Sequence, residues 1–179
     1  MLKRGIAFAC ALAVLMGTMS MITDAAAQTA RAEFKDRQGR AIGHADLTQG
    51  PNGVLIYLEL RDLPPGPHGV HIHNVGTCDD HAEGFQASKG HINPGSKAHG
   101  LLNPRGPDNG DLPNIFAAGD GTARAEMFTT LVSLDGNGSP ALLDSDGAAI
   151  LIHENRDDHM AQPIGGAGAR IACGVISAR

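Results

Sequence analysis

The chain has 179 residues, and its 14 Lys plus Arg against 19 Asp plus Glu give a formal net charge of −5. This length corresponds to one domain with a single buried core, and no linker, repeat or low-complexity tract divides it. Because nucleic acid attracts proteins rich in Lys and Arg, we expect no nucleic-acid partner for an acidic chain.

The first 27 residues have the pattern of a secretory signal. Lys3 and Arg4 precede an apolar run that ends near Met21, and Ala25, Ala26 and Ala27 follow as a small-residue cleavage site. A membrane span is the alternative, but the apolar run is shorter than the roughly 18 unbroken residues that a span needs.

We therefore predict a signal peptide at residues 1–27, one domain at residues 28–179, and no stable membrane association after cleavage. The cleaved chain keeps 12 Lys plus Arg against 18 Asp plus Glu, a net charge of −6, because residues 1–27 hold two bases and one acid. In a bacterium with two membranes, export places the protein in the periplasm. In other cells the same signal means secretion or a cell-surface location.

The exported part alternates apolar and polar side chains, which predicts an all-β fold of antiparallel strands. Between residues 53 and 61, for example, Val54, Ile56 and Leu58 alternate with other residues, and turns rich in Gly and Asn separate such segments. No long segment has helical periodicity. The predicted strands lie near residues 30–37, 41–48, 53–61, 67–74, 122–129, 147–153 and 170–176.

Residues 75–121 have many Gly, Pro, Asn and Asp residues and few apolar ones. A connection of this length is usually functional or disordered. Histidines and aspartates inside and beside this segment favour function, because metal ligation supplies the order that a core does not.

Four histidines in three separated segments are candidate metal ligands: His71, His73, His91 and His153. On a strand, His71 and His73 lie on one face about 6 to 7 Å apart, so both reach one ion. Imidazole is the commonest neutral metal ligand, and several nitrogen donors suit copper better than calcium or magnesium. His68 points to the opposite face, which is typical of a hydrogen-bonded structural histidine.

Two cysteines remain outside the predicted signal, Cys78 and Cys173. In an exported chain, two cysteines are most simply interpreted as one disulfide. Two free buried thiols are the alternative.

The motifs GVHIH, GHINP, GDLPN, IHENRDD and GGAGARIACGVI occur in the order found in copper-zinc superoxide dismutases. From about Ala32 to Ile176 the chain resembles the exported bacterial branch of that family. The resemblance implies an eight-stranded Greek-key β-barrel or sandwich with long metal-binding and electrostatic loops. It also implies copper and zinc as cofactors and superoxide as a small-molecule substrate.

The resemblance further implies a role for each matching residue. Copper would bind His71, His73, His91 and His153. Zinc would share His91 as a bridging ligand and add His99 and Asp111. Asp157 would hydrogen-bond one histidine of each ion, His71 and His99. Cys78 and Cys173 match the family disulfide, and Arg170 would attract the anion at the mouth of the copper channel.

One zinc position departs from the family, whose H-x-G-D-L motif begins here with Asp108. A carboxylate oxygen is a competent zinc ligand, so we hypothesise that Asp108 binds zinc. The alternative is a site with three protein ligands, completed by water or often empty.

The implied function is conversion of superoxide to dioxygen and hydrogen peroxide by copper redox cycling. Arg170 and His91 are the expected catalytic residues, His91 by returning a proton. A periplasmic copper- and zinc-binding protein with little turnover is the alternative, because the zinc site is atypical. Metal-assisted hydrolysis fits less well, since four imidazoles leave little room for an activated water. The sequence leaves both a monomer and a homodimer open.

Overall fold

The computed structural model describes residues 28–179, so the predicted signal peptide lies outside the described residues. The described part contains nine β-strands, and one 3-10 turn, η1, at Gln86–Ser88. No helix within residues 28–179 is long and apolar enough to cross a membrane. The strands are β1 Thr29–Asp36, β2 Ala41–Gly50, β3 Gly53–Leu60, β4 Gly66–His68, β5 Val70–His73, β6 Ile115–Ala117, β7 Ala123–Thr129, β8 Ala149–His153 and β9 Arg170–Ala178.

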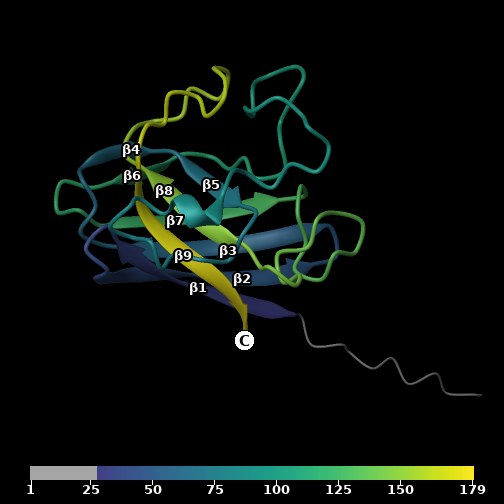
Figure 1. Cartoon of the computed structure of the whole chain (residues 1–179), viewed down its shortest axis with the longest axis horizontal. Helices are drawn as coiled ribbons and strands as arrows, with labels where there is room; N and C mark the ends of the chain where they lie inside the picture. The colour runs from purple at the N-terminus through teal and green to yellow at the C-terminus, as the bar shows by residue number, and fades with distance from the viewer. Residues whose placement is uncertain (1–27) are drawn as a thin grey trace, which may run out of the picture.

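Seven of these strands form one antiparallel sheet in the order β5-β8-β9-β1-β2-β3-β7, and β4 pairs with β6 (Figure 1). β4 leads directly into β5, and β6 packs beside β7. The short pair therefore links the two edge strands of the sheet, which lie far apart in its order. This arrangement confirms the predicted all-β fold.

Strand alternation places the apolar side chains on one face of the sheet. Leu47 on β2 pairs with Ile56 on β3, and Ala45 pairs with Leu58, and all four side chains are fully buried. The three larger side chains, those of Leu47, Ile56 and Leu58, each contribute about 1.5 to 3 kcal/mol by leaving water. The residues between them in β3 face outward, which explains the period of two in the sequence.

Two details of the strands differ from the prediction. The predicted strand at 67–74 is divided at Gly69, because β4 pairs with β6 whereas β5 pairs with β8. A side chain at Gly69 would lie 3.0 Å from the Ala167 Cβ, so glycine allows the close approach at this corner. β6 was not predicted, because only Ile115 and Ala117 are buried in its three residues and so short an alternation is no signal.

The two long loops that follow β5 and β8 lie on the same side of the sheet in Figure 1, in teal and in yellow-green. The Leu102 amide donates to the His159 carbonyl (3.2 Å), which joins them. A disulfide between Cys78 and Cys173, 95 residues apart in the sequence, ties the first loop to β9. The predicted disulfide is therefore confirmed.

Candidate metal centre

The metal centre is built on the free edge of β5. The His71 and His73 side chains are buried, and the loop before β6 lies along this strand through bridges from His71 to Asp111 and from His73 to His91. The Ile72 amide donates to the Gly110 carbonyl (2.8 Å) and the Ile92 amide donates to the Ile72 carbonyl (3.0 Å). The edge strand thus holds two segments of the long loop in place by backbone hydrogen bonds.

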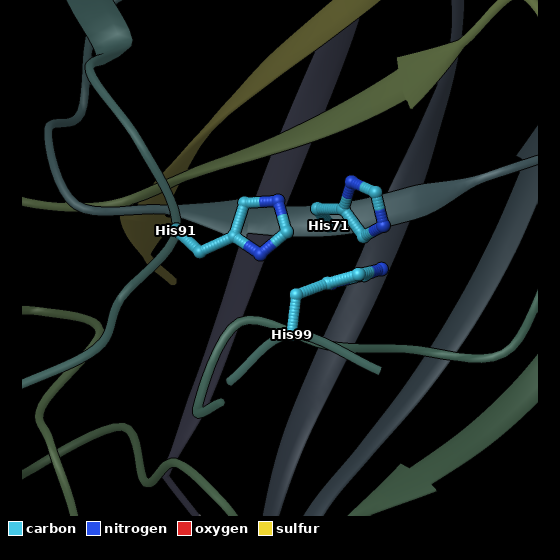
Figure 2. Close-up of side chains that lie close together, drawn as sticks. All are labelled: His71, His91 and His99. Carbon is cyan, nitrogen blue, oxygen red and sulfur yellow. The ribbon is translucent and has the colours of Figure 1, made fainter. Parts of the chain in front are cut away.

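The ligand-type atoms gather in two adjacent groups. His71, His73 and His153 form one, with their ligand atoms within 4.8 Å of one another, and His91, His99, Asp108 and Asp111 form the other. Figure 2 shows His71 on its strand beside His91 and His99 from the loop. The ring centroids of His71 and His91 are 4.2 Å apart, so His91 lies where the two groups meet.

In three histidines of this centre, one ring nitrogen is bound to an acceptor and the other is left free. The His71 Nε2 donates to Asp157 (2.8 Å), the His73 Nδ1 to the Lys89 carbonyl (2.7 Å), and the His153 Nδ1 to the Gly168 carbonyl (3.0 Å). These acceptors cannot donate, so they fix the tautomer of each ring and leave the opposite nitrogen as a bare lone pair.

The free nitrogens have no hydrogen-bond partner although they are buried. They are His71 Nδ1, His73 Nε2, His91 Nε2 and His153 Nε2. A buried acceptor without a partner costs about 1 to 3 kcal/mol. A metal ion is the partner that the grouped nitrogens of His71, His73 and His153 suit, and the His91 ring lies beside this group. The residues present therefore fit copper.

The second group carries negative charge. The Asp108 Oδ2 lies 2.9 Å from the His91 Nδ1, and the Asp111 Oδ1 lies 2.5 Å from the His99 Nδ1. Asp108 is buried, and its Oδ1 accepts the Gly110 amide (2.9 Å). Two imidazoles and two carboxylates are a ligand set that zinc accepts.

Asp157 connects the two groups. Its Oδ2 accepts from His71 (2.8 Å) and its Oδ1 accepts from the His99 Nε2 (3.1 Å), while the whole residue is inaccessible to solvent. Such a carboxylate fixes the orientation of both rings. The hydrogen bonds also hold the pKa of Asp157 far below its usual range, in spite of burial, so it is ionised.

The two groups differ in the basicity of their histidines. Burial lowers the pKa of His153 to about 3 and holds that of His73 well below 6.5. Burial also acts on His99, but the carboxylates of Asp111 and Asp157 outweigh it and raise its pKa to about 10. The pKa of His91 is likewise raised, because Asp108 and Asp111 outweigh its burial. The first group is therefore neutral near pH 7, whereas His99 in the second holds a proton in the metal-free protein.

Arg170 lines a cavity of about 430 Å³ together with His73, His91 and His153. Its guanidinium donates to the carbonyls of Phe85 (2.6 Å) and Lys89 (2.7 Å). Burial lowers the pKa of Arg170. Because the pKa of an arginine side chain is ordinarily far above neutral pH, the guanidinium stays positively charged. The cavity thus combines a fixed cation with access to the first group, and Ile164 forms part of its wall.

Several contacts of the site were not predicted from the sequence. The Lys89 carbonyl accepts from both His73 and Arg170, but a backbone acceptor leaves no mark in the residue pattern. The His159 Nδ1 lies 3.5 Å from the Asp157 Oδ2, although no motif of the sequence points to His159. His68 is buried, and its two ring nitrogens contact the His153 and Pro64 carbonyls (both 2.7 Å), as expected of a structural histidine.

Comparisons with known proteins identify the family. The family pattern described as copper/zinc superoxide dismutase (SODC) matches residues 41–176. A superoxide dismutase [Cu-Zn] from Caulobacter vibrioides is 51% identical over 150 residues, which cover 83% of this chain and 85% of the relative.

Two solved structures have the same fold. A SOD-like protein from Bacillus subtilis matches with a TM-score of 0.76 at 35% identity, over 81% of this chain and 96% of that one. The Cu/Zn superoxide dismutase from Brucella abortus matches with a TM-score of 0.66 at 26% identity, over 83% and 99%. The family pattern, these relatives and the two adjacent ligand groups agree, and the chain belongs to the copper/zinc superoxide dismutase family.

Proposed function

We propose that this protein converts superoxide to dioxygen and hydrogen peroxide, with copper and zinc as cofactors. The observation that carries this proposal is the cluster of unpaired imidazole nitrogens of His71, His73 and His153, which lies beside His91 and its carboxylate-containing group. When bound, copper supplies the change of oxidation state that takes an electron from one superoxide and returns it to the next.

The protein's own groups guide the substrate and its protons. Arg170 attracts the anion into the cavity and donates hydrogen bonds to it, since its guanidinium is already oriented by two carbonyls. In the half of the cycle in which the His91 Nε2 would not hold copper, it would carry a proton and deliver it to the outgoing peroxide, and the second proton would come from solvent. Two superoxide ions and two protons thereby give one dioxygen and one hydrogen peroxide.

We assign the second group to zinc, with His91, His99, Asp108 and Asp111 as ligands. The contact between Asp108 and the His91 Nδ1 (2.9 Å) supports Asp108 as the fourth ligand. A crystal structure of the zinc-loaded protein, with the Asp108 carboxylate far outside bonding distance, would contradict this assignment. Zinc would then have three protein ligands.

The test of the function is stopped-flow superoxide decay by the metal-loaded protein, normalised to bound copper. We expect fast decay in the wild type and a fall of about tenfold or more in Arg170→Ala, with partial recovery in Arg170→Lys because lysine keeps the charge but not the fork of donors. Decay no faster than that of free copper would instead favour a copper- and zinc-binding protein with little turnover.

The protein is proposed to be exported by residues 1–27 and to work in the periplasm, or outside a cell that has no periplasm. The disulfide between Cys78 and Cys173 supports an oxidising compartment. Mass spectrometry of the protein from a periplasmic extract should find a chain that begins at Gln28. A chain that retains residues 1–27 in the cytoplasm would contradict this proposal.

A single chain supplies every side chain of both ligand groups. Monomer and homodimer are therefore both compatible with activity, and we propose that no ligand comes from a partner chain. The activity per copper should then stay constant when the protein is diluted, while light scattering measures the oligomeric state.

A further inference from the structure

A third histidine approaches the carboxylate that connects the two ligand groups. His159 follows Asp157 by two residues, its backbone amide donates to the Asp157 Oδ1 (2.7 Å), and its Nδ1 lies 3.5 Å from the Oδ2. The His159 side chain is only 14% exposed. Asp157 is thus faced by an imidazole from each ligand group and by one that belongs to neither.

Asn114 determines which nitrogen of His159 carries the proton. The Asp157 amide donates to the Asn114 Oδ1 (2.9 Å), and an amide can only donate, so the orientation of the Asn114 side chain is defined. The Asn114 Nδ2 then donates to the Asp157 carbonyl (2.9 Å) and to the His159 Nε2 (3.0 Å). The Nε2 is therefore an acceptor, and the proton of the neutral ring is on Nδ1, on the side of Asp157.

Two further observations indicate that the surrounding structure directs the His159 ring toward Asp157. The His159 Nδ1 is buried and has no hydrogen-bond partner, so the nearest Asp157 oxygen is the group that compensates it electrostatically. The backbone at His159 has a φ of 61°, a left-handed conformation that is uncommon outside glycine, although Asn, Asp and His adopt it more often than other residues. This conformation lets one residue present both its amide and its ring to the same carboxylate.

We propose that His159 is a positioning residue for the zinc ligand His99 and the neighbouring copper ligand His71, acting through Asp157. Its Nδ1–H and amide stabilise the buried, ionised carboxylate in the place where it orients His99 and His71. The Asn114 side chain fixes the ring in the tautomer that this role requires. The inference rests on the proposed function, because it assumes that His99 binds zinc.

The test compares two substitutions that both suit the left-handed backbone. His159→Asn keeps an N–H close to the position of Nδ1, whereas His159→Gly removes the ring and keeps the backbone conformation. Zinc affinity is measured on the copper-free protein by competition with a chelator. We expect His159→Gly to weaken zinc binding about tenfold, the lower end for partners of metal ligands, and His159→Asn to stay within about threefold of the wild type.

A second measurement distinguishes positioning from general stability. In NMR spectra of the zinc-loaded, copper-free protein, the imidazole N–H protons of His71 and His99 should exchange with water about tenfold faster in His159→Gly than in His159→Asn. Equal zinc affinity and equal exchange in the two variants would overturn the role of His159 alone. A wild-type protein that binds no zinc would instead overturn the zinc half of the proposed function, and this inference with it.

Discussion

At the scale of single residues, the centre is divided by charge as well as by ligand type. Burial lowers the pKa of His71, His73 and His153, and for His71 it outweighs the hydrogen bond to the Asp157 carboxylate. His99 lies against two carboxylates, and its pKa is about 10. A neutral imidazole binds a metal without losing a proton, whereas a protonated one must release it first.

The raised pKa of His99 predicts that zinc binding releases protons and strengthens with pH. Below about pH 10 zinc must displace at least one proton, so its affinity should rise by about tenfold per pH unit near neutrality. Calorimetry in buffers of different ionisation enthalpy counts the protons released. Binding of copper to the first group should release almost none at pH 7, and an equal release for both metals would contradict the division by charge.

The pKa shifts of His99 and His153 predict opposite pH dependences for the stability of the metal-free protein. The folded pKa of His99 exceeds the ordinary value of 6.5, so its contribution is complete below pH 6.5 and is lost as the pH rises through about 10. The folded pKa of His153 is lowered to about 3, so its contribution is complete above pH 6.5 and is lost as the pH falls toward 3. The free energy of unfolding, measured with urea across this pH range, tests both dependences.

At the scale of elements, the edge strand β5 and the first residue of β9 depend on the long loop. The loop supplies the Phe85 and Lys89 carbonyls that hold Arg170. The Cys78–Cys173 disulfide fastens the same loop to β9 three residues after Arg170. Loop, disulfide and strand therefore form one unit that orients the cation.

Removal of the disulfide should lower both stability and activity. In Cys78→Ala/Cys173→Ala the unfolded chain regains the freedom of a loop of 95 residues, which costs about 4 to 5 kcal/mol in the loop-entropy account. The activity per bound copper should fall as well, because the carbonyls that orient Arg170 become mobile. Denaturant unfolding and stopped-flow decay measure the two effects, and unchanged activity in a folded variant would show that the loop positions Arg170 without the bridge.

At the scale of the whole molecule, the substrate and the protein have the same sign of charge. The chain without residues 1–27 has a net charge of −6, from 12 bases and 18 acids. We therefore expect any attraction of superoxide to come from the local field of Arg170, which lines the cavity together with the buried Asp108.

The salt dependence of the rate reports which field dominates. If Arg170 guides the anion, the second-order rate should fall as salt screens it between about 0.01 M and 0.15 M, where the Debye length shortens from about 30 Å to about 8 Å. Arg170→Ala should lose most of this dependence. A rate that rises with salt in the wild type would show that the acidic surface repels the substrate more strongly than Arg170 attracts it.

The all-β fold and most of its strands could be predicted because alternation is a local property of the sequence. The H-x-H pair on β5 was predictable for the same reason, since a strand sends alternate side chains to one face. The single strand predicted at 67–74 is divided at Gly69 in the structure, because its two halves pair with different strands. Those partner strands lie far away in the sequence, so the local residue pattern does not indicate the pairing.

By itself the sequence determined the residue types of the centre, the order of its motifs and their likeness to one family. Tertiary structure alone decided that the free nitrogens of three histidines come together beside a fourth. It also decided that the Lys89 carbonyl accepts from both His73 and Arg170, and that Asn114 orients His159 toward Asp157. The physical reason is that tautomers, carbonyl contacts and pKa values depend on which distant groups are brought within about 3 Å.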